Sequence, residues 1–323
     1  AQRGGDGGGD AVRRRRRPPG GAPGIAPAPP VRWGVLGAAW IADVALLRVM
    51  REAAGVEPLA IAARDPARAH ELAARHGVPR VHDGYAALLT DPDVDAVYLP
   101  LPNSLHLPWV QRALAAGKHV LCEKPLALNA TEAREMAGAA RAAGRLLMEA
   151  AMYRFHPRMR ALAAALTGAE VRHLSASFAF PIGKPDNYRM RPELGGGALL
   201  DVGFYVADVA RWLLGEPERV EAVIRREAVD MSCSALLGFP GGAQAALFAS
   251  FEAVEHQELV LVCADRVERV ERPFTGGHDP LEPYRLMLEA FSEAVRTGGP
   301  APLPLESSIA TLRLLDRIRD AAG

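Results

Sequence analysis

Apolar residues follow two different spacings along the first half of the chain. Short continuous apolar runs are typical of buried strands, and apolar residues three or four positions apart predict helices. The predicted strands and helices alternate strictly, in the order 31–36, 40–54, 59–63, 66–76, 80–82, 85–89, 94–99, 105–116, 119–122, 130–143 and 146–149. This alternation indicates βαβ units, so we predict an α/β domain with a parallel sheet over residues 31–152.

The pattern changes after about residue 152. Helices are predicted at 158–166 and 198–213, and strands with alternating polarity at 171–180, 219–226, 233–239, 243–251, 258–262 and 267–270. Helices at 283–296 and 306–321 close the chain, the last one capped near Ser307. Strands in series, with helices grouped apart from them, predict an α+β domain with a mainly antiparallel sheet over residues 153–323.

Residues 1–30 differ from the rest in composition. They consist mainly of Gly, Pro, Ala and Arg, with five consecutive arginines at 13–17, and contain no aromatic residue. Such a segment cannot bury enough apolar surface to order itself, so we predict a disordered basic tail. The arginine run is compatible with nucleic-acid binding or the start of an export signal. No apolar stretch follows it, however, so we expect an inert tail.

The net charge and the cysteines exclude several classes of protein. The 38 basic and 38 acidic residues balance, which argues against a nucleic-acid or membrane partner. No apolar run approaches the roughly 18 residues that span a bilayer. Cys122, Cys233 and Cys263 are too few and too far apart for a disulfide framework or a zinc site. We therefore expect a cytoplasmic protein that binds no metal.

The first predicted strand leads into a turn of small residues. Gly37 allows a tight turn, and Ala39 occupies the middle position of a G-x-G-x-x-G/A pattern. Small residues there let the backbone approach a pyrophosphate at the start of the next helix, which begins at Trp40 and Ile41. The location of the turn favours a Rossmann-type dinucleotide site. A tight turn without a ligand is the alternative.

The end of the second predicted strand distinguishes between two cofactors. Arg64 stands where a guanidinium binds the 2′-phosphate of NADP, whereas an acidic residue there would bind the ribose of NAD. Asp65, followed by Pro66, fits the cap of a helix. We therefore favour NADP, although Asp65 leaves NAD possible.

Lysine is scarce, with only Lys118, Lys124 and Lys184 against 35 arginines. Lys124 directly follows a buried strand, in Glu123-Lys124-Pro125, and ligands of open α/β sheets lie beyond the carboxyl ends of the strands. A cation there is suited to polarising a substrate oxygen. The alternative is a solvated lysine paired with Glu123.

Four motifs together resemble the Gfo/Idh/MocA oxidoreductase family. They are residues 37–42, Pro102-Asn103-Ser104, Glu123-Lys124-Pro125, and the three glycines at 195–197 followed by Asp201 and Tyr205. The chain is most similar to the D-xylose dehydrogenase and dimeric dihydrodiol dehydrogenase branch, and similar also to NDP-hexose 3-ketoreductases. The resemblance implies hydride transfer between NAD(P) and a sugar-like CH–OH or ketone carbon.

The resemblance also implies roles for individual residues. Lys124 matches the lysine that contacts the reacting oxygen, Tyr205 the proton donor or acceptor, and Asp201 the acidic residue one helical turn earlier. A nearby Lys124 would stabilise the Tyr205 phenolate. The residues expected at the cofactor are Gly37, Ala39, Trp40, Ile41, Arg64, Leu101, Asn103, His106, Glu123, Lys124 and Pro125, although His106 also suits a structural role. Those expected at the substrate are Arg154, His156, Tyr188, Asp201 and Tyr205.

Three functions remain open. The first is an oxidoreductase acting on a free sugar or cyclic polyol. The second is reduction of a ketone on a nucleotide-linked sugar, for which Tyr188, Arg189 and Arg191 are candidates to bind the nucleotide. The third is a non-catalytic NADP-binding sensor or assembly protein on the same fold. An apolar outer face of the antiparallel sheet would predict a homodimer or homotetramer.

Overall fold

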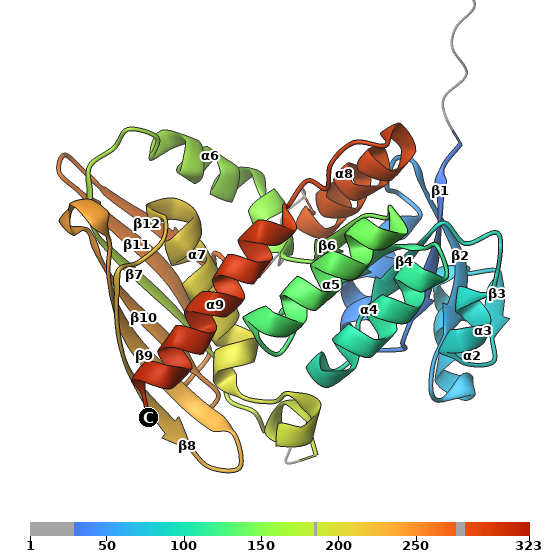
Figure 1. The fold of residues 1–323 in the computed structure, drawn as a ribbon, viewed down its shortest axis with the longest axis horizontal. Helices are drawn as coiled ribbons and strands as arrows, with labels where there is room; N and C mark the ends of the chain where they lie inside the picture. Colours follow the sequence, from blue (N-terminus) through green and yellow to red (C-terminus); the bar gives the residue numbers. More distant parts are fainter. Residues whose placement is uncertain (1–28, 184–185, 276–281) are drawn as a thin grey trace, which may run out of the picture.

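The computed structural model describes residues 29–183, 186–275 and 282–323. The described chain forms two six-stranded sheets with helices packed on them (Figure 1). Nearly all of the basic tail predicted at 1–30 lies outside the described residues. The two-sheet architecture confirms the predicted combination of an α/β and an α+β arrangement.

The first sheet has the strand order β3-β2-β1-β4-β5-β6, and every neighbouring pair is parallel. Its strands are β1 (Val31–Leu36), β2 (Val56–Ala62), β3 (Arg80–His82), β4 (Ala96–Leu99), β5 (His119–Cys122) and β6 (Leu147–Glu149). The strand order reverses between β1 and β4. Ligands of Rossmann folds bind at such a point, outside the carboxyl ends of the strands.

Five helical segments connect these strands. After β1 the chain forms π-helical turns at Ala42–Leu47 and then α1 (Arg48–Met50). The others are α2 (Pro66–His76), α3 (Tyr85–Leu89), α4 (His106–Ala115) and α5 (Ala130–Ala143). The helix predicted at 40–54 is therefore too long, because α1 ends at Met50 and Gly55, with φ of +71°, turns the chain into β2.

The second sheet has the order β12-β11-β7-β10-β9-β8. Its strands are β7 (Val171–Ala179), β8 (Arg219–Arg226), β9 (Asp230–Gly238), β10 (Gln244–Ser250), β11 (His256–Cys263) and β12 (Val267–Glu271). All neighbouring pairs are antiparallel except β7 and β10, which are parallel. The sheet is thus mixed but mainly antiparallel, as predicted.

The helices of the second half are α6 (Pro157–Ala165), α7 (Phe204–Leu214), α8 (Pro283–Thr297) and α9 (Leu305–Ala321). The helix predicted at 198–213 begins with a π-helical turn, Leu199–Gly203, and continues as α7. The predicted cap near Ser307 is wrong, because α9 begins at Leu305 without a side-chain cap. The Ser307 hydroxyl instead accepts a hydrogen bond from Arg211 at 2.5 Å.

The last two helices link the two sheets. The Trp33 indole N–H of β1 donates to the Ser292 hydroxyl of α8 at 3.1 Å. α9 runs diagonally between the sheets (Figure 1), and its Asp316 accepts the Ala130 N–H at the start of α5 at 2.9 Å. Both helices fall within the range 153–323 expected for the second domain, yet both pack on elements of the first half of the chain.

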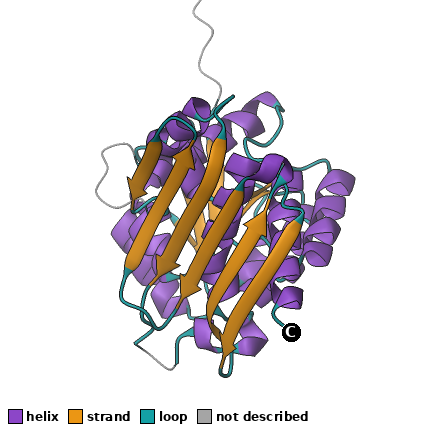
Figure 2. Ribbon diagram, turned by 90° about the vertical axis from the view of Figure 1, so that its left-hand side faces the viewer, coloured by secondary structure: helices purple, strands orange, loops and turns teal. Residues whose placement is uncertain are grey.

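The two faces of the second sheet have different surroundings. Leu174, Ala176 and Phe178 of β7 are buried on the inner face, which packs against α7. Figure 2 shows the sheet with its outer face toward the viewer and the long helices behind it. The inner face thus brings α7 toward the carboxyl ends of the first sheet, and the outer face is left without a helical layer.

Candidate active site

The turn after β1 carries the small residues that a dinucleotide site requires. Gly37 has φ of +135°, and a Cβ atom there would lie 3.2 Å from a methyl group of Leu101. Any side chain at this position would be strained and crowded. Ala39 and Ile41 are partly exposed and Trp40 is 71% exposed, so the turn is open to a pyrophosphate. The residues present therefore fit the predicted cofactor.

Two arginines lie near this turn. Arg64 is exposed directly after β2. Arg68, in the first turn of α2, donates to the Ala38 carbonyl at 2.7 Å. Asp65 accepts the Ala67 N–H at 3.0 Å and caps α2, as its position before a proline predicts. The Asp65 carboxylate is thus used within the helix, while the Arg68 guanidinium contacts the turn and Arg64 is exposed after the neighbouring strand.

The segment after β4 contacts both halves of the chain. Asn103 is only 5% exposed, and its Nδ2 donates to the Gly195 carbonyl at 2.8 Å. His106 is fully buried, with its ring nitrogens 2.9 Å from the carbonyl oxygens of Leu101 and Pro125. His106 therefore connects the loops that contain Leu101 and Pro125, and its buried ring has no face open to a ligand.

Lys124 extends from the end of β5 toward the second half of the chain. Its Nζ donates to Oδ1 of Asp201 at 2.7 Å and to the Asp201 carbonyl at 3.2 Å. Glu123 points into the core, where Tyr98 donates to its carboxylate at 2.6 Å and burial raises its pKa. Lys124 therefore forms its ion pair with Asp201, and not with Glu123 as in the alternative interpretation of the sequence.

Two buried side chains hold the backbone after Lys124, where the peptide bond to Pro125 is cis. His106 contacts the Pro125 carbonyl at 2.9 Å, and Glu149 at the end of β6 accepts the Leu126 N–H at 2.6 Å. Glu149 is 1% exposed, and burial is the main cause that raises its pKa to about 7. These contacts place the Lys124 side chain on a fixed backbone.

Asp201 is held between two cations. Its Oδ1 lies 2.7 Å from Lys124 Nζ, and its Oδ2 accepts from Arg189 Nε at 2.6 Å. Burial would raise the pKa of Asp201, but Lys124 and Arg189 outweigh this and hold the pKa well below its usual range. The carboxylate therefore stays ionised, and two positive charges face one negative charge.

Three consecutive glycines allow the Asp201 turn to pack closely. A Cβ atom at Gly196 would lie 2.4 Å from the Arg189 carbonyl oxygen, and one at Gly197 would lie 2.1 Å from the Asp230 carboxylate. That carboxylate accepts the Leu199 N–H at 2.5 Å. Asp230 therefore caps the helical segment, which leaves the Asp201 side chain for Lys124 and Arg189.

Tyr205 lies beside Lys124, whose Nζ is 4.8 Å from the centre of the tyrosine ring. Burial, and next the carboxylates of Glu123 and Asp201, raise the pKa of Tyr205 well above 10. In this state the ammonium faces the ring of a neutral phenol, and the stabilisation of a phenolate by Lys124 stays a prediction. A neutral phenol is a proton donor.

Aromatic side chains surround Tyr205 on the inner face of the second sheet. Its ring centre lies 5.3 Å from that of Phe178 and 5.5 Å from that of Phe274. The ring centre of Phe180, directly after β7, is 6.1 Å from that of Phe178. The site therefore combines an ammonium donor, a phenol and an apolar wall, an arrangement that suits an oxygen on an otherwise apolar ring face.

Comparison with known proteins identifies the family. A model described as "Oxidoreductase family, NAD-binding Rossmann fold" matches residues 31–151, and one for the GFO/IDH/MocA C-terminal domain matches residues 156–267. D-xylose 1-dehydrogenase (NADP(+)) 2 of Haloferax volcanii is 39% identical over 316 residues, which cover 90% of this chain and 97% of that protein. The chain belongs to the Gfo/Idh/MocA family. The resemblance seen in the sequence motifs is thereby confirmed.

Solved structures of Gfo/Idh/MocA proteins share the fold over nearly the whole described chain. A 3-ketoreductase from Actinomadura kijaniata, in complex with NADP and TDP-benzene, has a TM-score of 0.82 at 33% identity and covers 90% of this chain and 98% of its own. Aldose-aldose oxidoreductase from Caulobacter crescentus, complexed with glycerol, has a TM-score of 0.85 at 26% identity, covering 91% and 97%. Relatives by sequence also include trans-1,2-dihydrobenzene-1,2-diol dehydrogenases.

Two residues expected at the substrate of this Gfo/Idh/MocA protein are engaged elsewhere. Arg154 donates from Nε and Nη2 to Asp208 of α7, each at 2.8 Å, and its guanidinium lies 4.8 Å from the Trp212 ring centre. His156 accepts the Arg158 N–H at 3.1 Å at the start of α6. Arg154 thus belongs to a buried network, and His156 acts as a helix cap.

Tyr188 lies close to the group formed by Lys124, Asp201 and Tyr205. It is partly buried, and burial together with the Asp201 charge raises its pKa. The Arg189 guanidinium lies 4.8 Å from its ring centre.

The sequence does not predict the contact between Arg189 and Asp201, or that between Arg68 and the turn after β1. It left Arg189 and Arg191 together as loop residues of undecided role. The structure separates them, because Arg191 pairs with Glu193 at the surface, at 2.7 Å, whereas Arg189 reaches Asp201. Arg191 lies closer to the glycine run than Arg189, so position in the sequence does not separate the two.

Within the described ranges, no helix is long and apolar enough to cross a membrane. In the same residues, no group of three His, Cys, Asp or Glu side chains is placed to hold a metal ion. Cys122, Cys233 and Cys263 are all buried as free thiols.

Proposed function

We propose that this protein is an NADP-dependent oxidoreductase that transfers hydride to or from a CH–OH or ketone carbon of a sugar or related cyclic polyol. The observation that carries the proposal is the group formed by Lys124, Asp201 and Tyr205. Lys124 follows β5, and the proposed phosphate-binding turn follows β1 of the same sheet. The substrate class is supported by the names of the relatives, a D-xylose dehydrogenase and a 3-ketoreductase. In this proposal residues 31–152 bind the dinucleotide and residues 153–323 bind the substrate.

Each residue has a distinct role. The Lys124 ammonium donates to the reacting oxygen and stabilises the negative charge that develops there. Tyr205 gives its proton to that oxygen when a carbonyl is reduced, and takes it back in the reverse direction. Asp201 holds Lys124 in place. The bound nicotinamide supplies or accepts the hydride.

The cofactor preference rests on the arginines near the turn. Arg64 is exposed where the 2′-phosphate of NADP would lie, and Arg68 stands one helical turn further on. Asp65, the residue that would favour NAD, is engaged as a helix cap. In this proposal Gly37 and Ala39 leave room for the pyrophosphate, and Asn103 contacts the nicotinamide ribose.

Reduction of a ketone on a nucleotide-linked sugar is the second candidate. The similarity to the 3-ketoreductase supports it. The contacts that it needs are less well supported, because Arg189 is bound to Asp201 and Arg191 to Glu193. We therefore rank a free sugar or cyclic polyol first.

A substrate panel tests the proposal. Free sugars and cyclic diols are assayed with NADP⁺, and nucleotide-linked ketosugars with NADPH. Lys124→Met is expected to lower kcat by about 100-fold or more while NADPH binding stays near that of the wild type. Unchanged turnover in this variant would refute the mechanism. NADPH binding without turnover on any substrate would favour the non-catalytic sensor.

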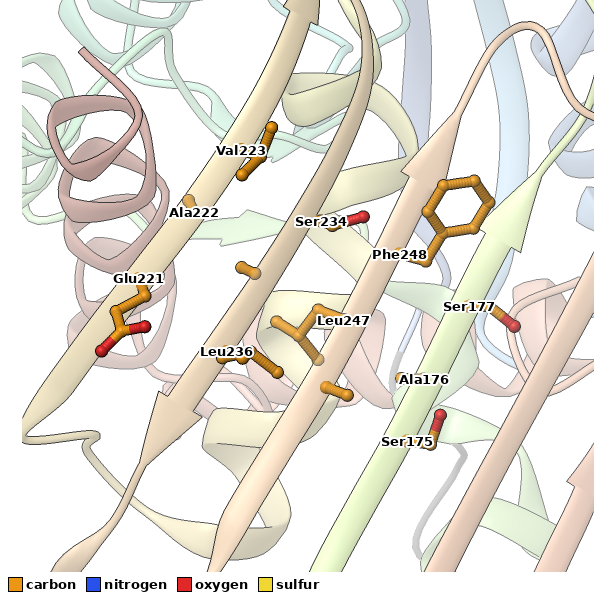
Figure 3. A pocket seen from close by; sticks show the side chains of 12 residues that line it. Ser175, Ala176, Ser177, Glu221, Ala222, Val223, Ser234, Leu236, Leu247 and Phe248 are labelled. Atoms are coloured by element: carbon orange, nitrogen blue, oxygen red, sulfur yellow. The ribbon is translucent and has the colours of Figure 1, made fainter.

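A homo-oligomer is part of the proposal. The outer face of the second sheet exposes Val223 (74%), Leu236 (60%) and Phe248 (36%), which lie on neighbouring strands (Figure 3). Apolar patches of this kind usually mark interaction sites. The same patch lies on every copy, so two copies can pair face to face in a symmetric homodimer. The three buried thiols fit a reducing compartment such as the cytoplasm.

A further inference from the structure

Arg189 reaches the active site from a loop of the second half of the chain. It lies in the short helical turn Tyr188–Met190, and its Nε donates to Asp201 Oδ2 at 2.6 Å. Its side chain is 29% exposed, compared with 54% for Arg191 two positions later. Arg189 is therefore held against the carboxylate, whereas its neighbour lies at the surface.

The backbone around Arg189 is held on the cofactor side as well. The Arg189 carbonyl accepts the Gly197 N–H at 2.9 Å, which ties the arginine to the glycine run. The Gly195 carbonyl, at the start of that run, accepts from Asn103 at 2.8 Å. The loop is thus anchored to a residue that we expect beside the nicotinamide ribose, and the guanidinium position depends on both halves of the chain.

The charges around Asp201 show what the guanidinium does. Lys124 and Arg189 lie on separate oxygens of one carboxylate. Without Arg189, the whole negative charge would be balanced by Lys124 alone, and the ammonium would be drawn away from a reacting oxygen. Without Arg189, burial would also favour the neutral acid, which cannot anchor Lys124 by charge.

We propose that Arg189 is a positioning residue of the active site. It binds the Asp201 carboxylate opposite Lys124, keeps that carboxylate ionised, and leaves the ammonium available to the reacting oxygen. The inference rests on the proposed function. It adds a role that differs from binding a nucleotide substrate, because Arg189 acts through Asp201 and Lys124.

Other titratable groups also face Asp201. Tyr188 and Tyr205 are neutral phenols with raised pKa values, and the buried Glu123 carboxyl also has a raised pKa. None of these three adds a positive charge. Loss of Arg189 therefore removes one of the two cations that lower the pKa of Asp201.

The test compares Arg189→Gln, Arg189→Lys and the control Arg172→Gln, at an exposed arginine that pairs with Glu170, in the full-length protein on the best substrate of the panel. We expect Arg189→Gln to lower kcat roughly 10-fold or more near neutral pH with little change in the KM for NADPH. We expect the acidic limb of its kcat profile to move up by about one pH unit or more, because Asp201 then protonates more easily. Arg189→Lys restores most of the activity, and Arg172→Gln behaves as the wild type.

Three results would overturn the inference. They are an unchanged kcat in Arg189→Gln, an equal loss at every pH with no shift of the acidic limb, and a loss seen only as a raised KM for nucleotide-linked substrates. Circular dichroism and NADPH binding show whether Arg189→Gln is folded, and the pH profile of Arg189→Lys, which keeps a cation beside Asp201, tests the inference if it is not. Failure of the proposed function gives a different result, namely a wild type without turnover or an active Lys124→Met.

Discussion

Replacing Glu149 by glutamine is expected to change how the stability of the protein depends on pH. The Glu149 carboxylate accepts the Leu126 N–H at 2.6 Å and is 1% exposed. Burial, and next the carboxylate of Asp208, raise its pKa from 4.5 to about 7. Glutamine has the same shape, keeps an oxygen for the Leu126 N–H, and cannot ionise.

The sign follows from proton binding. Between pH 4.5 and about 7 the folded protein holds a proton on Glu149 that the unfolded chain has released. The free energy of unfolding therefore falls as the pH rises through this range, by at most about 1.4 kcal/mol per pH unit. Over about 2.5 units the loss reaches about 3 kcal/mol, as an upper estimate for a fully buried group. Glu149→Gln removes this loss.

Guanidinium unfolding monitored by tryptophan fluorescence measures the effect at pH 5 and pH 8. We expect the free energy of unfolding of Glu149→Gln, relative to that of the wild type, to be up to about 3 kcal/mol higher at pH 8 than at pH 5. Glu135→Gln, the same substitution at an exposed position of α5, serves as the control and is expected to show little pH-dependent difference. A Glu149→Gln effect that is identical at both pH values would refute the reasoning.

Two further predictions concern cofactor choice and assembly. Arg64→Ala is expected to weaken NADPH binding roughly 10-fold or more with little effect on NADH, measured by fluorescence titration, because a charge-assisted contact to the 2′-phosphate is lost. Equal weakening of both cofactors would contradict this role. Leu236→Arg places a charge in the apolar outer face and is expected to yield monomers in sedimentation velocity, whereas Val254→Arg, in the exposed loop after β10, does not. A monomeric wild type would contradict the proposed dimer.

The sequence predicted both sheets because their signals are local. Strict alternation of short apolar runs and helical spacing indicates a parallel sheet, whatever the distant contacts are. The parallel pairing of β7 with β10 had no such signal, because it depends on which strands meet after the chain has passed through α7. The π-helical turns at Ala42–Leu47 and Leu199–Gly203 were also missed, since apolar spacing is nearly the same in π- and α-helical turns.

The candidate site could be predicted only in part, because motifs are local signals and contacts between distant residues leave none. Lys124 and Tyr205 could be named from their motifs, and the structure brings them together. The contact of Lys124 with Asp201 joins residues 77 positions apart, and motif spacing alone carries no distance. Arg154 and His106 carry the same chemical groups as site residues, but burial commits them to internal contacts. Only the three-dimensional packing distinguishes these uses.

In the proposed mechanism, the charges at the site suit the transition state that carbonyl reduction and alcohol oxidation share. Lys124 and Arg189 face the ionised Asp201 carboxylate beside Tyr205. Reduction of a carbonyl places negative charge on its oxygen, which the Lys124 ammonium stabilises, and then requires a proton. Tyr205, whose pKa is raised by burial, is suited to supply that proton. Oxidation uses the same groups in reverse and starts from the Tyr205 phenolate, so we expect oxidation to require a higher pH than reduction.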